Sequence, residues 1–233
     1  MRKLLPALVA ALAAVVLAFG LSACGGSSSG KSSDSSAGSQ STSTSYTTKA
    51  EGPYASGTHH ALVKVKGYDA FTIELSADNA PVTVSNFAKL AQDGYYNGLA
   101  FYRVVDGFCL QGGTKGNTAS GDDASLTPIV GEFSSNGIEN KLASSFKKGT
   151  VAMARTNAVN SATSTFFITL ASSDAVSKSL DGKYAAFGTI DEAGMKIVDK
   201  IVADSLPAVS DQQMGTISDE SKMPIIESIS LVD

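Results

Sequence analysis

The sequence predicts a mainly β domain, in which a closed or sandwiched antiparallel sheet is capped by two helices. Two observations predict this class. Short runs with the alternating or β-rich pattern of strands recur along the chain from about residue 58 onward. Only two segments, 81–94 and 193–203, carry apolar residues at helical spacing. Because predicted strands outnumber predicted helices, we expect a sheet to form the body of the domain.

The first predicted elements form a hairpin. Residues 59–66, HHALVKVK, alternate apolar and polar side chains, and residues 70–75, AFTIEL, do the same. A turn at Gly67, Tyr68 and Asp69 separates the two runs. This pattern is typical of two half-buried antiparallel strands joined by a tight turn.

The next predicted element is an amphipathic helix over residues 81–94. Its apolar residues recur three and four positions apart, which places them on one face of a helix. We expect Asn79 to cap the N-terminus, Pro81 to lie in the first turn and Gly94 to end the helix.

The remaining predicted elements are seven further strands and a second helix. The helix is predicted over residues 193–203, AGMKIVDKIVA. The strands are predicted at 100–105, 108–111, 128–133, 150–154, 166–170, 184–190 and 224–232.

The N-terminus has the organisation of a secretory signal. Arg2 and Lys3 precede an uncharged apolar stretch over 4–23 that ends in small residues. The stretch is also about long enough to cross a bilayer, since ~20 apolar residues suffice, so a retained anchor helix is the alternative. The run LSAC, ending at Cys24 and followed by two glycines, resembles the lipobox of bacterial lipoproteins. We therefore predict a signal peptide over 1–23 and acyl chains on Cys24 that anchor the protein outside a bacterial cell membrane.

Residues 24–57 are predicted to link this anchor to the folded domain at 58–233. Residues 25–48 are almost wholly Ser, Thr and Gly, so they bury too little apolar surface to offset the entropy of the chain. A flexible tether that gives the domain reach is one interpretation. A glycosylated or simply disordered tail of no tuned length is the other.

Composition and charge exclude several classes of function. Removal of the signal, with its two cations, changes the formal net charge from −4 to about −6, whereas a nucleic-acid partner requires a basic face. If Cys24 carries lipid, Cys109 is the only cysteine left and no intramolecular disulfide forms.

His59 and His60 are the only histidines, and adjacent strand residues point to opposite faces, so we predict no shared metal. Common hydrolase and nucleotide-binding motifs are absent, so we predict no cofactor, and a monomer is the default expectation.

Three segments together carry a family resemblance. They are FYRVVDGFCLQGG at 101–113, GTVAMARTNAVNSATSTFFITL at 149–170 and LDGKYAAFGTI at 180–190. In order and approximate spacing they resemble segments of cyclophilin-type peptidyl-prolyl isomerases. The resemblance implies an eight-stranded antiparallel β-barrel closed at its ends by two helices. It also implies isomerisation of X-Pro bonds without a cofactor, and proline-containing peptide segments as partners.

The reaction explains why an arginine is needed. Amide resonance holds an X-Pro bond planar behind a barrier of ~18–20 kcal/mol. Twisting the bond leaves a basic lone pair on the prolyl nitrogen, so a fixed guanidinium donor stabilises the twisted state more than the planar one. Arg103 matches the catalytic arginine of the family, and an arginine stays charged and presents a planar fork. By the same resemblance Gln111 orients this arginine and reaches the substrate backbone.

The proline ring requires an apolar pocket. The positions that match the family supply Phe108, Phe167 and Leu180. Alternation along a strand puts Phe166 and Phe167 on opposite faces, so we expect Phe166 in the core and Phe167 in the groove.

Three positions are expected to contact the peptide along the groove. Ala154 and Arg155 fall where the family uses an extended segment to pair with the substrate backbone. Arg155 stands where Asn is frequent, so we expect its side chain to add affinity for acidic peptides. Tyr184 replaces a frequent His and keeps an aromatic ring with a polar tip.

Three further positions depart from the family pattern. Cys109 stands where a larger side chain, commonly Met, lines the pocket, so we expect a roomier pocket that is sensitive to oxidants if exposed. Thr165 replaces a frequent Gln that bonds substrate. Ser179 replaces the Trp of cyclosporin-sensitive members, so weak cyclosporin binding is expected.

The sequence thus favours an active but not optimal isomerase that assists folding of extracytoplasmic proteins at the membrane surface. A binding module of the same fold, which holds Pro-containing segments without turning them over, is the alternative. An adhesin or transporter subunit is a third hypothesis, supported only by the anchor and tether.

Overall fold

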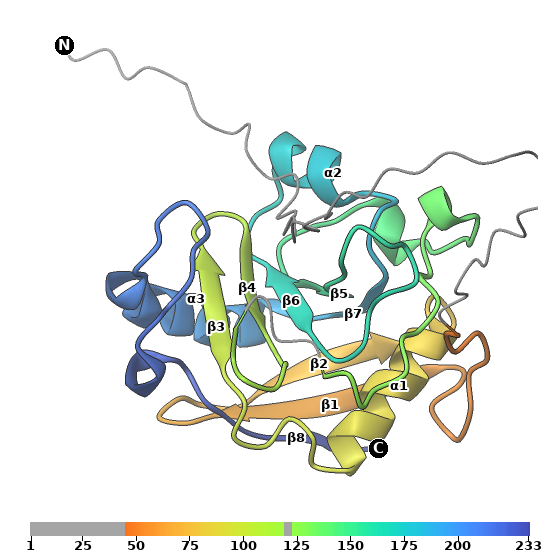
Figure 1. Cartoon of the computed structure of the whole chain (residues 1–233), viewed down its shortest axis with the longest axis horizontal. Helices are drawn as coiled ribbons and strands as arrows, with labels where there is room; N and C mark the ends of the chain where they lie inside the picture. The colour runs from red at the N-terminus through yellow and green to blue at the C-terminus, as the bar shows by residue number, and fades with distance from the viewer. Residues whose placement is uncertain (1–44, 119–122) are drawn as a thin grey trace, which may run out of the picture. The chain divides into compact units, whose positions relative to one another are not determined.

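The computed structural model describes residues 45–118 and 123–233, and residues 46–233 form one compact unit. These residues form eight antiparallel strands and three α-helices (Figure 1). The helices are α1 (Pro81–Gln92), α2 (Asp174–Leu180) and α3 (Glu192–Ser205). The strands are β1 (Thr58–Val65), β2 (Phe71–Ser76), β3 (Phe101–Val105), β4 (Cys109–Gly112), β5 (Thr150–Met153), β6 (Phe166–Thr169), β7 (Ala186–Thr189) and β8 (Ile226–Leu231).

The strands form one sheet in the order β3-β4-β6-β5-β7-β2-β1-β8. The predicted hairpin is confirmed, since β1 pairs with β2 in register from Thr58 opposite Ser76 to Val63 opposite Phe71. The helices predicted at 81–94 and 193–203 are also confirmed, as α1 and α3. Helix α1 packs against β8 and β2, and α3 packs against β2 (Figure 1).

The predicted closure of the barrel is wrong, because the sheet is a curled half-barrel with β3 and β8 at its edges. One isolated bridge, between Ala100 and Ile225, joins these edges where a closed barrel would have a ladder. The rest of the free edge of β3 is occupied by the C-terminal segment around Gly215. Val104 N donates to the carbonyl of Gly215 at 2.7 Å, and Ile217 N donates to that of Tyr102 at 2.9 Å. The chain thus protects an exposed strand edge without closing the sheet.

The strand predicted at 128–133 is also wrong. Ile129 alone makes bridges there, to Thr47 and Ala162. At Gly131 the segment passes close to another loop, since a Cβ there would come within 2.3 Å of the carbonyl oxygen of Val159. The segment thus makes isolated bridges and no strand ladder.

The N-terminus of α1 is capped by a distant residue instead of by Asn79. The N-cap position is Ala80, which offers no side-chain hydrogen bond. The carboxylate of Glu132 accepts from Val82 N at 3.0 Å and from Thr83 N at 2.8 Å. Glu132 is 3% exposed, so this pairing satisfies helix donors that would otherwise be buried without a partner. The side chain of Asn79 instead donates to Ser76 Oγ at 2.7 Å.

Apolar side chains gather in two clusters on opposite faces of the strands. The main core lies inside the curled sheet and contains Phe166. A smaller group, here called the outer cluster, contains Phe167 and covers the other face. The predicted opposite placement of these two phenylalanines is thus confirmed. The outer cluster consists of Cys109, Phe133, Ala143, Phe146, Ala152, Phe167, Val176, Leu180, Ala185 and Ala186.

Helix α2 was not predicted from the sequence. It is only seven residues long and buries just Val176 and Leu180, so no helical period stands out. Its N-cap Ser173 accepts a hydrogen bond from Val176 N, and its two buried residues complete the outer cluster. This helix therefore positions one of the predicted pocket residues.

Residues 46–57, ahead of β1, pack on the domain. Thr47 N donates to the carbonyl of Pro128, and Val130 N donates to that of Thr47, both at 2.8 Å. Among residues 45–118 and 123–233, no helix combines the length and hydropathy of a membrane span. The predicted signal peptide and Cys24 lie outside the described residues.

Candidate active site

Sheet register brings two of the predicted catalytic residues, Arg103 and Gln111, into one row with the predicted pocket residue Phe167. Arg103 on β3 lies opposite Gln111 on β4, and Gln111 lies opposite Phe167 on β6. Directly opposed residues of antiparallel strands present their side chains on the same face. The row therefore places a guanidinium, an amide and an aromatic ring side by side on the face of the outer cluster.

The guanidinium of Arg103 is fixed from two sides. Its Nε donates to the carbonyl oxygen of Met214 at 2.7 Å, and its Nη1 donates to Oε1 of Gln111 at 2.9 Å. Nη1 also lies 3.4 Å from Sγ of Cys109. The residue is 9% exposed, so a cation is held at the surface of an apolar cluster with its orientation set. Such preorganisation lets a charge act without rearranging during a reaction.

Gln111 is held in turn. Its Nε2 donates to the hydroxyl of Tyr102 at 2.7 Å, which leaves the carbonyl end of the amide facing Arg103. An acceptor at the nitrogen end and a donor at the oxygen end thereby fix the orientation of the amide. The residue is half-buried, so one side of it remains open toward solvent.

Cys109 forms part of the floor of this row. It is 1% exposed, and burial raises the pKa of its thiol to about 11, while the Arg103 guanidinium opposes this rise. The thiol is therefore protonated at neutral pH and shielded from reagents. Sensitivity of the pocket to oxidants was expected only if this thiol were exposed, and the thiol is buried.

The predicted proline-pocket residues all join the outer cluster. Phe167 is 5% exposed and Leu180, the last residue of α2, is 3% exposed. Phe108, half-buried, packs against the same cluster. Phe146 stacks on Phe167 with centroids 6.3 Å apart and planes inclined by 12°. These contacts produce a firm apolar surface beside Arg103.

The predicted backbone-binding segment borders the same cluster, against which Ala154 packs. Ala154 N donates to the carbonyl oxygen of Thr165 at 2.9 Å, so β5 and β6 stay paired just beyond their assigned ends. The ring of Tyr184 meets Phe167 edge-on, with centroids 5.6 Å apart and planes at 89°. The Arg155 guanidinium lies over the Tyr184 ring, 4.8 Å from its centre. All ten predicted site residues of the domain thus lie in or around one face of the sheet.

Sequence reasoning missed the groups that support the site. Asp211 Oδ1 accepts from the backbone N–H groups of Gln213 and Met214, both at 2.9 Å, and so fixes the turn whose carbonyl holds Arg103. No local pattern links residue 214 to residue 103, because 111 positions separate them. Phe133 and Phe146 were missed for a similar reason, since each lies in a loop segment whose packing partners are distant.

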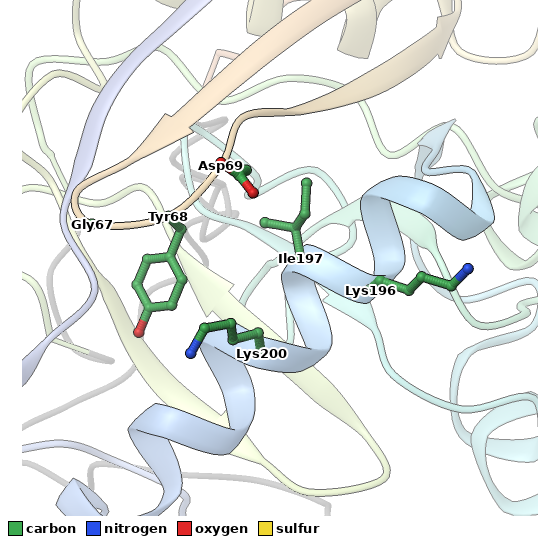
Figure 2. A pocket seen from close by; sticks show the side chains of 6 residues that line it. All are labelled: Gly67, Tyr68, Asp69, Lys196, Ile197 and Lys200. Carbon is green, nitrogen blue, oxygen red and sulfur yellow. The ribbon is translucent and has the colours of Figure 1, made fainter.

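A separate hollow lies away from this face. It has a volume of about 580 Å³ and lies between the β1–β2 turn and α3, where Tyr68, Lys196 and Lys200 line it (Figure 2). Both lysines form ion pairs within α3, Lys196 with Glu192 and Lys200 with Asp204. Because the charges are paired and none of the predicted site residues lines it, this hollow is not the candidate active site.

Ser179 lies exposed on α2, where its hydroxyl donates to the carbonyl of Ala175 at 2.8 Å. No aromatic ring therefore extends the apolar surface at this position. Among residues 45–118 and 123–233, no group of three or more His, Cys, Asp or Glu side chains is arranged to hold a metal ion.

The fold and this row of residues define the class of protein. The family model described as cyclophilin type peptidyl-prolyl cis-trans isomerase matches residues 60–225, and the chain belongs to that family. Membership of the family supports isomerase activity for this chain.

Curated relatives carry the same activity in their names. A peptidyl-prolyl cis-trans isomerase of Acinetobacter baylyi is 41% identical over 130 residues, which cover 55% of this chain and 64% of the relative. Peptidyl-prolyl cis-trans isomerase A of Dickeya dadantii is 34% identical, over 73% of this chain and 82% of the relative. Peptidyl-prolyl cis-trans isomerase B of Escherichia coli is 37% identical, over 62% and 80%.

Solved structures show the same fold. The crystal structure of a cyclophilin type peptidyl-prolyl cis-trans isomerase from Cryptosporidium parvum has a TM-score of 0.61 at 23% identity, and covers 76% of this chain and 99% of that chain. A second structure of that protein, obtained in the presence of the dipeptide Ala-Pro, has a TM-score of 0.59 at 24% identity.

Proposed function

We propose that this chain catalyses cis–trans isomerisation of X-Pro bonds in extracytoplasmic proteins and so assists their folding at the membrane surface. The observation that carries the proposal is the fixed guanidinium of Arg103 beside the apolar surface of Phe167. A charged donor with a set direction next to an apolar platform suits a substrate that is apolar at its proline ring and basic at its twisted nitrogen.

Each residue of the row, together with Phe108 and Leu180, has a defined part in this proposal. Phe108, Phe167 and Leu180 hold the proline ring, and Arg103 donates to the prolyl nitrogen as the bond twists. Gln111 keeps the guanidinium in place and offers its amide to the substrate backbone. No bond is made or broken, so the unaided reaction, which takes tens of seconds or longer, is accelerated by electrostatic stabilisation alone.

The remaining predicted residues complete the groove. Ala154 and Arg155 pair with the peptide in extended form, and Tyr184 and Thr165 border it. Cys109 supports the floor beneath Arg103, which its buried position favours.

The location of the enzyme is part of the proposal. A signal peptide over 1–23 and lipid on Cys24 would hold the domain to the outer side of the cell membrane through the predicted linker at 24–57. Expression of Cys24→Ser should shift the protein from the membrane fraction to a soluble or uncleaved form, and should abolish labelling by palmitate. Cys109→Ser is the matched control and should keep both labelling and membrane association.

Exchange NMR spectroscopy tests the catalytic part. Purified 46–233 domain added to a short X-Pro peptide should produce cis–trans exchange cross-peaks that are absent without protein. Shifted peptide resonances without exchange peaks would instead support the binding module. The departures from the family pattern at Cys109, Thr165 and Ser179 favour that alternative. Absence of both effects would reject the two functions together.

A further inference from the structure

A guanidinium at the rim of the outer cluster is held in place by four contacts. Nε of Arg155 donates to the carbonyl oxygen of Lys183, and Nη1 donates to that of Thr156, both at 2.9 Å. Cζ of Arg155 lies 4.8 Å from the ring centre of Tyr184 and 5.2 Å from that of Phe133. A long side chain that is usually free on a surface is therefore ordered here before any ligand arrives.

Most of the donors of this guanidinium remain unused. Arginine carries five N–H groups, and the two hydrogen bonds to carbonyl oxygens occupy one on Nε and one on Nη1. Arg155 has no part in the eight ion pairs that the described residues form. Three N–H groups and a full positive charge are thus available at a half-buried position.

The charges around Arg155 favour an anionic partner. Lys183 and Lys178 are exposed nearby, where Lys183 Nζ donates to the carbonyl of Lys178. The nearest carboxylate along the same loop, that of Asp181, accepts from Phe146 N at 2.8 Å and supports the loop instead of pairing with Arg155. The rim is therefore locally positive although the whole chain is acidic.

The position of Arg155 relates it to the substrate groove. Tyr184, on which it stacks, also meets Phe167 edge-on, and Phe167 lies in the row with Gln111. These two ring contacts put the guanidinium at most about 10 Å from Phe167, a distance that about three extended residues span.

We propose that Arg155 determines specificity by binding an acidic side chain of the substrate within about three residues of the isomerised proline. The inference rests on the proposed function and names its preferred substrates, X-Pro segments that carry Asp or Glu. A guanidinium matches a carboxylate with two parallel hydrogen bonds. Because Arg155 is already ordered, little side-chain entropy is lost when the carboxylate binds.

Paired peptides test this inference. Each pair contains the same X-Pro sequence and differs only by Glu or Gln at one of the three positions on either side of the dipeptide. For the wild-type domain in low salt, kcat/KM at one or more positions should be about two- to fivefold higher with Glu, the range of a half-exposed ion pair. The ratio should fall to about one in Arg155→Gln and should shrink in 0.5 M salt.

Two further variants control the result. Lys178→Gln removes a nearby cation without touching the stacked guanidinium and should keep the Glu preference. Arg155→Lys keeps the charge but loses the planar fork, so it should show a reduced preference for the Glu peptides. This variant replaces Arg155→Gln if Arg155→Gln does not fold. A ratio of one at every position in the wild type, or a preference that survives in Arg155→Gln, overturns the inference.

The same peptides distinguish failure of the proposed function from failure of this inference. If the wild type accelerates no peptide, including the Gln peptides, the isomerase proposal fails. The Glu and Gln peptides are then compared by their Kd in NMR titrations, and the same ratios decide whether Arg155 selects acidic segments.

Discussion

Nη1 of Arg103 donates a hydrogen bond to Oε1 of Gln111 across 2.9 Å, between two residues that face each other on β3 and β4. The carbonyl of Met214 holds the same guanidinium at its Nε from the other side. Two acceptors at different atoms of one planar group fix its position and its plane. The proposed catalytic cation is therefore oriented by the fold before substrate binds.

Loss of the acceptor on Gln111 should impair catalysis. Gln111→Met keeps the length of the side chain but leaves Nη1 of Arg103 without this partner. A hydrogen bond to a charged group contributes about 1.5–3 kcal/mol, so we expect kcat/KM to fall at least tenfold. Steady-state isomerisation assays with an X-Pro peptide measure this change, and an unaltered kcat/KM would show that Gln111 does not orient the arginine.

Asp211 should act on Arg103 through the turn that it stabilises. Asp211→Ala removes the acceptor for Gln213 N and Met214 N, so the Met214 carbonyl loses its fixed direction. We expect kcat to fall several-fold while KM changes little. Asp219→Ala is the matched control, because Asp219 accepts from Ser221 N in a comparable turn that does not hold Arg103. Equal effects of the two variants would argue against a positioning role.

The thiol of Cys109 should resist modification at neutral pH. Its pKa is raised to about 11 by burial, so iodoacetamide at pH 7.5 should label the folded domain far more slowly than the urea-unfolded chain. Since the folded-state pKa lies above the ordinary value of 9.0, this group stabilises the fold fully below about pH 9. That contribution is lost as the pH rises through 11. Mass spectrometry follows the labelling, and rapid alkylation of folded protein would contradict the buried position.

Glu132 should be important for stability through its contact with α1. Glu132→Ala leaves two backbone N–H groups at the start of the helix without their partner, and buried unpaired donors cost about 1–3 kcal/mol. We expect a decrease of this size in the free energy of unfolding, measured by urea denaturation. Glu139→Ala, at an exposed position in the same segment, should leave stability unchanged.

Most of the strands, and all three residues of the row, could be predicted from the sequence. Alternation in β1 and β2 predicted their pairing, and the spacing of apolar residues predicted α1 and α3, because these elements bury one face each. Arg103, Gln111 and Phe167 could be named from segments that resemble the family. Their alignment in a row then follows from register, which the sequence did not state.

The parts that could not be predicted depend on contacts distant in sequence. Closure of the barrel was wrong because the segment around Gly215 occupies the edge of β3. The cap of α1 comes from Glu132, which lies 50 positions from Val82, and no local pattern encodes such a partner. Helix α2 is too short for a period to appear. Propensity and pattern describe single elements, whereas these features arise from packing between elements.

The central claim is that the oriented guanidinium of Arg103 lowers the barrier to rotation of the X-Pro bond. The most direct measurement is kcat/KM for one X-Pro peptide with the wild-type domain and with Arg103→Ala, and with Lys64→Ala as a variant that loses an exposed cation on β1. We predict that Arg103→Ala removes most of the acceleration, while Lys64→Ala retains it. Wild-type turnover by folded Arg103→Ala protein would contradict the account.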